Sequence, residues 1–457
     1  MTTKPFYTRR EFIKTAGAAA GGTLVAAPAL AGAGSFFKEK RRMALVGTGV
    51  RGVSMFGRSL RANYSDTVEL VSLCDINPGR LQVAREYIGG NLPAYTDLDE
   101  MLAAQKPEVL IVTSRDDVHH EHIITGMRHG CDIITEKPLT IDEQKAQAII
   151  NAEKEYGRKV IVTFNYRYPP YRAKIKELIM EGYVGDIRSV DFHYHISHSH
   201  LMRYMQRWHG QRQYGGSLWV HKSTHHFDMA NWWINSDPEE VTAWGALERF
   251  GRKGPFRGNN CRDCNFTSQC PYHWNILENE HLRTLYTDNE QYDGYIRDNC
   301  VFREEIDIWE KHTAVVKYAN GAIMTYSLTA DTGFEGYKLV VNGTEGRLEV
   351  RAGGWPRKFG EEITFMPNRR YSDREEEQFF VEHGSGGHWG GDPVMTDQLF
   401  RDPDRPDPLR QQAGVRDGVM SILVGVAARK SIDSGNRPVN IGDLTTIQPH
   451  PARGLEV

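Results

Sequence analysis

Residues 43–52 have the sequence Met43-Ala44-Leu45-Val46-Gly47-Thr48-Gly49-Val50-Arg51-Gly52. The four apolar residues are typical of a short buried strand, and the glycines that follow have the GxGxxG spacing. In this motif the first glycine permits a tight turn, the second lets a diphosphate approach the backbone, and the third lets the next helix pack on the strand. The N-terminus of that helix offers free N–H groups to phosphate. The stretch therefore predicts the start of a dinucleotide-binding domain.

An acidic residue follows the next predicted strand. Val68–Cys74 is a second apolar run, and Asp75 comes about 26 residues after Gly49, close to the spacing of a carboxylate that binds the adenosine ribose. An acid at this position favours NAD, because it would repel the 2′-phosphate of NADP. NADP remains the alternative.

Three further segments complete this half of the chain. Val109–Thr113 is predicted to be a buried strand, His119–Arg128 a helix, and Cys131–Thr135 a strand that leads into Glu136-Lys137-Pro138. Proline suits a fixed turn after a strand, because it locks φ and has no N–H to donate. The alternation of strands and helices predicts an α/β fold with a doubly wound parallel sheet. We expect the cofactor to contact Gly47, Gly49, Val50, Arg51, Gly52, Asp75, Thr113, His120, Glu136 and Lys137.

The order of these motifs resembles the glucose-fructose oxidoreductase, inositol dehydrogenase and rhizopine catabolism family, known as Gfo/Idh/MocA. The resemblance implies a Rossmann domain at residues 42–165 and an α+β domain with a large, mostly antiparallel, open-faced sheet at residues 166–440. It also implies that Lys137 lies beside the nicotinamide and the reacting hydroxyl group. A homodimer or homotetramer is expected, because the open sheet face serves for association in this family.

The pattern of the second half agrees with that expectation. Strand-like runs alternate with turns such as Ala319-Asn320-Gly321, which is typical of antiparallel hairpins. Helices are predicted at residues 171–181 and 414–434, and the second of these is expected to cover the domain junction. The predicted strands are Ile187–His195, Val241–Leu247, His312–Lys317, Ala322–Ala330, Lys338–Asn342 and Arg347–Val350.

A second set of polar residues lies between Gly215 and Asp228. His225 matches the family's catalytic histidine, and Asp228 matches the acid three residues after it. His221 stands where the sugar dehydrogenases usually have aspartate, which puts simple alcohol oxidation in doubt. Positions 221 and 225 share one face of a helix, so both histidines are expected to face one pocket. With Lys137, they can move a hydroxyl proton; core packing and a metal bound between the two histidines are the alternatives.

Substrate contacts are expected from the domain junction, from the segment between Gly215 and Asp228, and from a glycine-rich loop. The family has an asparagine-aromatic-arginine element at the domain junction, and a glycine-rich loop at residues 382–392 carries a histidine that can bond sugar hydroxyls. The expected substrate-binding residues are Asn165, Tyr166, Arg167, Lys222, His226 and His388.

Four cysteines fall in or beside an insertion at about residues 252–300. Cys261, Cys264, Cys270 and Cys300 have the number and chemistry needed for a tetrahedral structural zinc site. Two disulfides are the alternative if the protein reaches an oxidising compartment. An iron-sulfur cluster would use the same ligands, but the spacing is not a common cluster pattern.

The first residues resemble a twin-arginine export signal. Arg9-Arg10 precedes an Ala/Gly-rich run that ends in Ala29-Leu30-Ala31, so residues 1–31 are predicted to be removed after export to the periplasm by the twin-arginine machinery. The run is too short and glycine-rich for a stable membrane anchor. Because free NAD is scarce there, we expect a tightly bound NAD that is regenerated on the enzyme.

Composition narrows the classes of function. With 457 residues, 40% of them hydrophobic, the chain is long enough for two domains. A formal charge of −3 with dispersed Lys and Arg gives no reason to expect a nucleic-acid partner. We expect hydride transfer from a ring carbinol carbon of a carbohydrate or glycoside. The alternatives are redox-neutral glycoside cleavage through a 3-keto intermediate, by a glycoside hydrolase or lyase, and a non-catalytic sensor on the same fold.

Overall fold

The computed structural model describes residues 40–353 and 360–453. The predicted twin-arginine signal at residues 1–31 lies outside the described residues. In the two described ranges, no helix is both long and apolar enough to cross a membrane.

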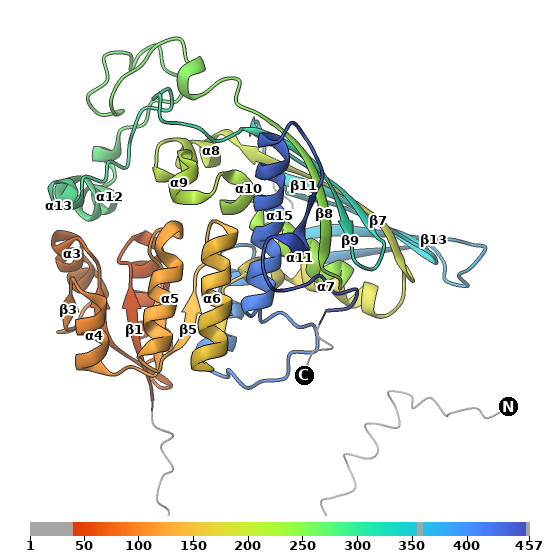
Figure 1. The fold of residues 1–457 in the computed structure, drawn as a ribbon, viewed down its shortest axis with the longest axis horizontal. Coiled ribbons are helices and arrows are strands. Elements are labelled where there is room, and N and C mark those ends of the chain that lie inside the picture. Colours follow the sequence, from red (N-terminus) through yellow and green to blue (C-terminus); the bar gives the residue numbers. More distant parts are fainter. Residues whose placement is uncertain (1–39, 354–359, 454–457) are drawn as a thin grey trace, which may run out of the picture. The chain divides into compact units, whose positions relative to one another are not determined.

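A six-stranded parallel sheet forms the core of the N-terminal half (Figure 1). Its strand order is β3-β2-β1-β4-β5-β6, with every neighbouring pair parallel, as a doubly wound fold requires. The central strands are buried on both faces, which explains their continuous apolar sequences. The predicted fold class is therefore confirmed for this half. The strands are β1 Arg41–Val46, β2 Val68–Cys74, β3 Ala94–Tyr95, β4 Val109–Val112, β5 Asp132–Thr135 and β6 Val160–Val162.

The helices α3, α4 and α6 of this half begin at side-chain caps. Asn77, Asp97 and Asp142 each accept a hydrogen bond from the backbone N–H three residues later, which satisfies a donor that the helix itself leaves free. The helical segments are η1 Gly52–Ser59, a π-helix, α2 Leu60–Asn63, α3 Pro78–Ile88, α4 Leu98–Gln105, η2 Asp116–Val118, α5 His119–Arg128 and α6 Glu143–Tyr156.

The second half contains a nine-stranded sheet of order β14-β13-β12-β11-β7-β10-β9-β8-β15. Only β7 and β10 pair in parallel, so the predicted mostly antiparallel sheet is also confirmed. The six predicted strands are present with small shifts in their ends, whereas β13, β14 and β15 had no predicted counterpart. The strands are β7 Ile187–Ser197, β8 Pro238–Ala246, β9 Lys311–Tyr318, β10 Ile323–Thr332, β11 Gly336–Gly343, β12 Gly346–Gly353, β13 Gly360–Pro367, β14 Glu377–Glu382 and β15 Val439–Asn440.

Helices cover one face of this sheet, and the strands alternate accordingly. Strand β9, for example, alternates strictly between exposed and buried residues. On the uncovered face, Trp244, Val315 and Ile323 remain exposed. The helical segments of the second half, outside the insertion, are η3 Asn165–Arg167, α7 Pro170–Met180, α8 His198–Met205, η4 Trp208–Gly210, α9 Arg212–Gly215, α10 Leu218–His221, α11 Thr224–Ile234, α14 Gly391–Phe400, α15 Val415–Asp433 and η8 Ile441–Asp443.

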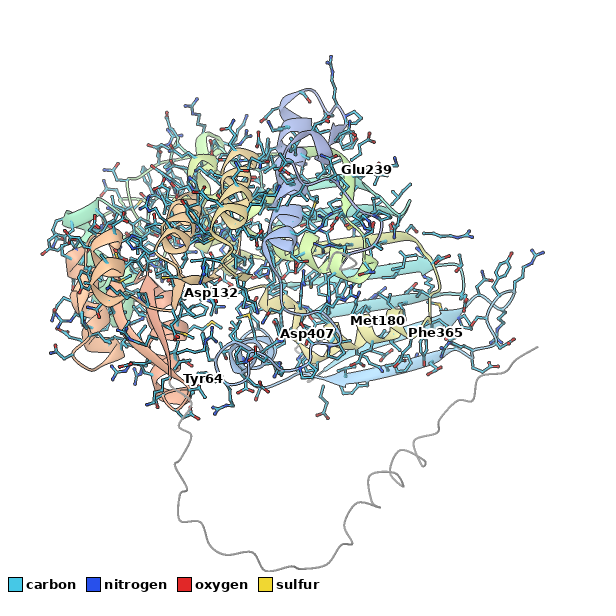
Figure 2. The ribbon with its side chains drawn as sticks, turned by 60° about the horizontal axis from the view of Figure 1, so that its bottom comes forward. Tyr64, Asp132, Met180, Glu239, Phe365 and Asp407 are labelled. Carbon is cyan, nitrogen blue, oxygen red and sulfur yellow. The ribbon has the colours of Figure 1, made fainter. Side chains whose placement is uncertain are left out.

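Segments from the end of the chain return to the parallel sheet. Ala413, just before α15, forms an isolated antiparallel bridge with Val162 of β6. Tyr64, labelled in Figure 2, packs against Phe400 of α14 and donates its hydroxyl to Thr396. These contacts hold the C-terminal segments against the half of the chain that contains the parallel sheet.

The insertion at residues 251–310 has little regular structure. It contains η5 Gly251–Lys253, η6 Ile276–Glu278, α12 Glu280–Leu285, η7 Thr287–Asn289 and α13 Glu290–Asp293. Figure 1 shows α12 and α13 beside α3 of the parallel sheet, where Leu285 and Tyr286 enter the same buried cluster as Met43. The insertion therefore spans from the second half of the chain to the half that contains the parallel sheet.

Candidate functional site

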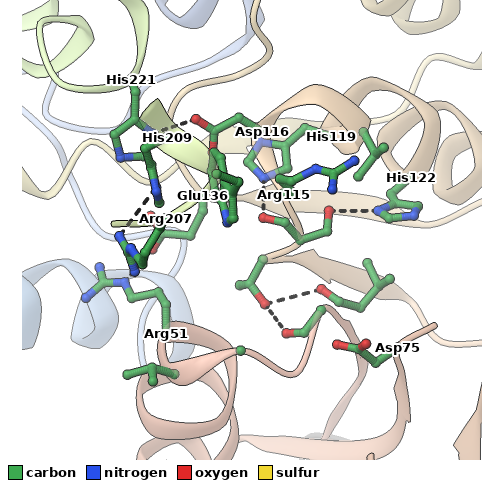
Figure 3. A pocket seen from close by; sticks show the side chains of 18 of the residues that line it. Arg51, Asp75, Arg115, Asp116, His119, His122, Glu136, Arg207, His209 and His221 are labelled. Atoms are coloured by element: carbon green, nitrogen blue, oxygen red, sulfur yellow. Dashed lines mark hydrogen bonds and ion pairs between the residues drawn. The ribbon is translucent and has the colours of Figure 1, made fainter. Parts of the chain in front are cut away.

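A cavity of about 660 Å³ lies between the parallel sheet and the second half of the chain (Figure 3). One wall is formed by the carboxyl ends of β1, β2, β4 and β5, which is where doubly wound sheets bind their ligands. The opposite wall comes from the segments around α8 to α11, the insertion and the glycine-rich loop.

The glycine-rich turn leaves no room for side chains. Gly47 has φ of +92°, and a Cβ added there would lie 2.5 Å from the Ser114 nitrogen. A Cβ on Gly52 would lie 2.2 Å from the Gly47 carbonyl oxygen, so Gly52 serves the turn without lining the cavity. Gly49 and Val50 do line the cavity, and the Val50 N–H donates to the Tyr286 hydroxyl (2.9 Å).

Asp75 closes the far end of this wall. Its carboxylate accepts hydrogen bonds from the Thr48 backbone N–H (2.8 Å) and hydroxyl (3.0 Å), and it pairs with Arg80 (2.9 Å). The cavity thus extends from a strand-end carboxylate, past a tightly packed glycine turn, to Lys137. This shape and these groups fit a dinucleotide bound along the sheet edge.

Lys137 lies at the other end of the wall. Its Nζ donates to the backbone oxygen of His221 (3.0 Å), and the adjacent Glu136 accepts from Arg51 Nε (2.7 Å). Burial lowers the pKa of Lys137 to about 8, against the opposing effect of the nearby carboxylates of Asp116 and Glu136. At neutral pH the amine is therefore protonated but can lose its proton more easily than an exposed lysine.

His221 belongs to a buried acid-histidine pair. Its Nδ1 lies 2.5 Å from Asp116 Oδ2, as Figure 3 shows. Burial lowers the pKa of His221 and raises the pKa of Asp116, and both directions favour a neutral pair that shares one proton. Sequence reasoning missed Asp116; its position a few residues after a parallel strand was the available signal.

The two histidines do not share one helix, contrary to the prediction. His221 is the last residue of α10, and α11 begins only at Thr224. Ser217 has φ of +78° and caps the start of α10 by accepting from the Trp219 N–H, and Lys222 and Ser223 separate α10 from α11. Both side chains nevertheless line the cavity.

His225 is the most available proton acceptor in the cavity. Its ring stacks on Tyr166 with centroids 3.9 Å apart, and among the residues described neither ring nitrogen has a hydrogen-bond partner. Burial lowers its pKa well below 6.5, and the positive charges of Lys137 and Lys222 lower it further. His225 is consequently neutral at pH 7 and ready to accept a proton.

Tyr166 and Lys222 form a second proton-carrying pair beside His225. Lys222 Nζ donates to the Tyr166 hydroxyl (3.1 Å) and lies 3.6 Å from Glu335 Oε1. Although burial opposes the shift, Lys222 and Arg172 lower the pKa of the Tyr166 hydroxyl. Burial would lower the pKa of Lys222, but the neighbouring Tyr166, Tyr204 and Glu335 raise it overall.

The glycine-rich loop reaches across to the nucleotide wall. Asp392 accepts from Asn165 Nδ2 (2.6 Å), contacts His388 Nδ1 (2.8 Å) and pairs with Arg51 (3.3 Å). His388 and Asn165 line the cavity, whereas Asp392 holds them in place from behind.

Besides Gly52, three of the expected binding residues lie outside the cavity lining. His120 points away from it, since neighbouring helix residues diverge by about 100°, and His119 faces it instead. His226 follows His225 in α11 and therefore also points away from the cavity. It is buried, and its Nδ1 bonds the hydroxyl of Tyr326 in β10 (2.8 Å). Arg167 is fully buried in an ion pair with Asp228, so this acid holds Arg167.

The predicted zinc site is not supported. Within residues 40–353 and 360–453, no three histidine, cysteine, aspartate or glutamate side chains are arranged to hold a metal ion, and Cys261, Cys264, Cys270 and Cys300 are all free. Burial raises the pKa of Cys261 to about 11 and raises that of Cys270 as well.

The fold and this cavity define an NAD-binding oxidoreductase. Residues 41–164 match the family model described as "Oxidoreductase family, NAD-binding Rossmann fold", and residues 176–441 match "Oxidoreductase family, C-terminal alpha/beta domain". The chain therefore belongs to the Gfo/Idh/MocA family.

Individual relatives agree with this assignment. The chain is 35% identical to "Putative oxidoreductase YteT" of Bacillus subtilis strain 168, over 89% of this chain and 99% of the relative. It is 28% identical to D-glucoside 3-dehydrogenase of Escherichia coli K12, over 32% of this chain and 41% of that enzyme. A solved structure of levoglucosan dehydrogenase with NADH has a TM-score of 0.63 at 17% identity, covering 88% of this chain and 99% of that chain. The fold is thus shared with an NADH-binding sugar dehydrogenase.

Proposed function

We propose that this chain is an exported NAD-dependent oxidoreductase that oxidises a ring carbinol carbon of a carbohydrate or glycoside. Bound NAD would supply the hydride acceptor. The observation that carries the proposal is the pair formed by Lys137, protonated but with a lowered pKa, and His225, a neutral imidazole without a partner, in one cavity. Relatives named as inositol and glucoside dehydrogenases support a sugar substrate.

The protein groups divide the proton chemistry between them. An unpartnered His225 ring can accept the hydroxyl proton of a bound sugar. The Lys137 ammonium, fixed by the His221 carbonyl, can donate to the same oxygen and stabilise negative charge on it. Aromatic rings beside them, such as Tyr166 and Trp208, suit the apolar C–H faces of a sugar.

The direct test is a panel of glycosides incubated with the purified mature protein, with NAD supplied. Absorbance of reduced nicotinamide and product masses are followed in the same reaction. Accumulated reduced cofactor with a product two mass units lighter supports net oxidation. No reaction with any glycan, while sugar binding is retained, would instead indicate a sensor.

A second candidate function is redox-neutral glycoside cleavage through a 3-keto intermediate. The Tyr166–Lys222 pair favours it, because elimination needs a group that removes a C–H proton in addition to the one that serves the hydroxyl. Its mark in the same assay is released aglycone with no net change in the cofactor. Tyr166→Phe should then abolish aglycone release while leaving sugar-dependent reduction of NAD.

We further propose that the protein acts in the periplasm after twin-arginine export, with NAD acquired before export and held tightly. The Arg9-Arg10 pair and the small residues up to Ala31 support this. Replacement of both arginines by lysine should leave the protein in the cytoplasm, as fractionation of the producing cells would show. A homodimer or homotetramer through the open sheet face is proposed from the exposed Trp244, Val315 and Ile323, and scattering in solution tests it.

A further inference from the structure

Three polar contacts bind the insertion to the nucleotide half. The Tyr286 hydroxyl accepts from the Val50 N–H (2.9 Å), and the Asn289 carbonyl accepts from Asn77 Nδ2 (2.9 Å). Asp293 pairs with Arg80 (2.6 Å), the same arginine that holds Asp75. The insertion therefore touches both the glycine-rich turn and the region of the strand-end carboxylate.

Two arginines enter the cavity from this side without an acidic partner. Arg207 and Arg297 both line it, and in the described part of the chain neither forms an ion pair with a carboxylate. Arg207 bonds only the Arg203 carbonyl (2.6 Å) and His209 (3.4 Å), the latter drawn in Figure 3. Arg297 Nε is buried with no hydrogen-bond partner at all.

Their positions relate both arginines to the glycine-rich turn. The Arg297 guanidinium lies 4.3 Å from the centroid of the Tyr286 ring, whose hydroxyl bonds Val50. Burial lowers the pKa of Arg207, and the positive charge of the nearby Arg297 is the next largest cause of that lowering. Two partly buried positive charges that repel each other are stabilised when an anion binds between them.

We infer that Arg207 and Arg297 bind the diphosphate of the dinucleotide from the side opposite the glycine-rich turn, so that the insertion holds the cofactor in its cavity. The diphosphate supplies the anionic partner that these two arginines lack, and the N-terminus of the helix after the glycine-rich turn favours a phosphate on the other side. The inference rests on the proposed NAD dependence, and it names the residues that make binding tight. Tyr286 would help to close the site, because its ring supports Arg297.

The test measures nucleotide binding and requires no turnover. Wild type, Arg297→Gln and Arg207→Gln are stripped of nucleotide, and the affinities for NAD, ADP-ribose and adenosine are measured by calorimetry. The dissociation rate of NAD is followed by exchange against labelled NAD. Each substitution should weaken NAD and ADP-ribose at least tenfold and speed NAD release similarly, with adenosine unchanged because it has no diphosphate.

Two further variants separate this effect from damage to the fold. Arg297→Lys keeps the charge and should retain most of the affinity that Arg297→Gln loses. Arg283→Gln alters an exposed arginine of the same insertion, paired with Asp288, and should bind NAD like wild type. Equal weakening of adenosine would indicate a distorted site and overturn the inference.

The remaining outcomes also decide the question. If both glutamine variants bind NAD and ADP-ribose like wild type, the arginines do not hold the diphosphate. A rise only in the KM of an acidic sugar would assign them to a substrate carboxylate instead. If NAD binds as expected but no sugar is oxidised, the proposed function fails while this inference stands.

Discussion

The two walls of the cavity are built in different ways. The nucleotide wall is drawn from residues 46–137, and its main groups sit at the ends of adjacent parallel strands. The opposite wall collects Asn165, Arg207, His225, Arg297 and His388 from segments that are far apart in the sequence. A wall of the first kind depends on local spacing, whereas the second depends on how the whole C-terminal half packs.

Substitutions at Lys137 and His225 should have the largest effect, and they test whether the reaction needs residues from both walls. Lys137→Ala removes the proposed proton donor of the first wall, and His225→Ala removes the proposed proton acceptor of the second. Each should lower kcat about a thousandfold, the usual range for a general acid or base, while NAD still binds. Steady-state rates and calorimetry check this, and His129→Ala, at a partly exposed histidine paired with Asp99, is the matched control. Unchanged rates in either alanine variant would contradict the assignment.

A substitution confined to the nucleotide wall should act through packing. Gly52→Ala places a methyl group 2.2 Å from the Gly47 carbonyl oxygen and 2.6 Å from Thr113 Oγ1. The cost should be about 1–3 kcal/mol, seen as a lower midpoint of thermal unfolding and weaker NAD binding. Gly333→Ala meets nothing within 4 Å and should leave both unchanged.

The pH profile shows how the walls share their charges. If the Lys137 ammonium is the active form, kcat/KM should fall as pH rises through about 8, the lowered pKa of this residue. Glu136 raises that pKa, so Glu136→Gln should move the alkaline fall to lower pH. A rate that increases through pH 8 would mean that the neutral amine is active instead.

The smallest expected effect concerns the loop that ties the walls together. Asp392→Asn removes the charge that pairs with Arg51 and holds Asn165 and His388. KM for the sugar should rise about threefold to tenfold with little change in kcat, since no proton carrier is lost. An equal loss in kcat would place Asp392 in the chemistry itself.

The contrast between the walls also explains what sequence reasoning could predict. The parallel sheet and the strands β7 to β12 follow from periodicity, turns and a motif whose glycines each have a steric task. By contrast, Arg207 and Arg297 carry no local signal, and the pairing of Asp116 with His221 joins residues 105 positions apart. The break between α10 and α11 was missed because the i, i+4 rule assumes an unbroken helix.

The contact between Val50 and Tyr286 bears on the order in which the protein folds. These residues are 236 positions apart, and Arg51 and Asp392 are 341 apart. Contacts over such separations form late, because the entropy of closing a long loop must be overcome first. The parallel sheet can thus assemble with an open nucleotide cleft during synthesis, and enclosure of the nucleotide has to wait until nearly the entire chain has been made.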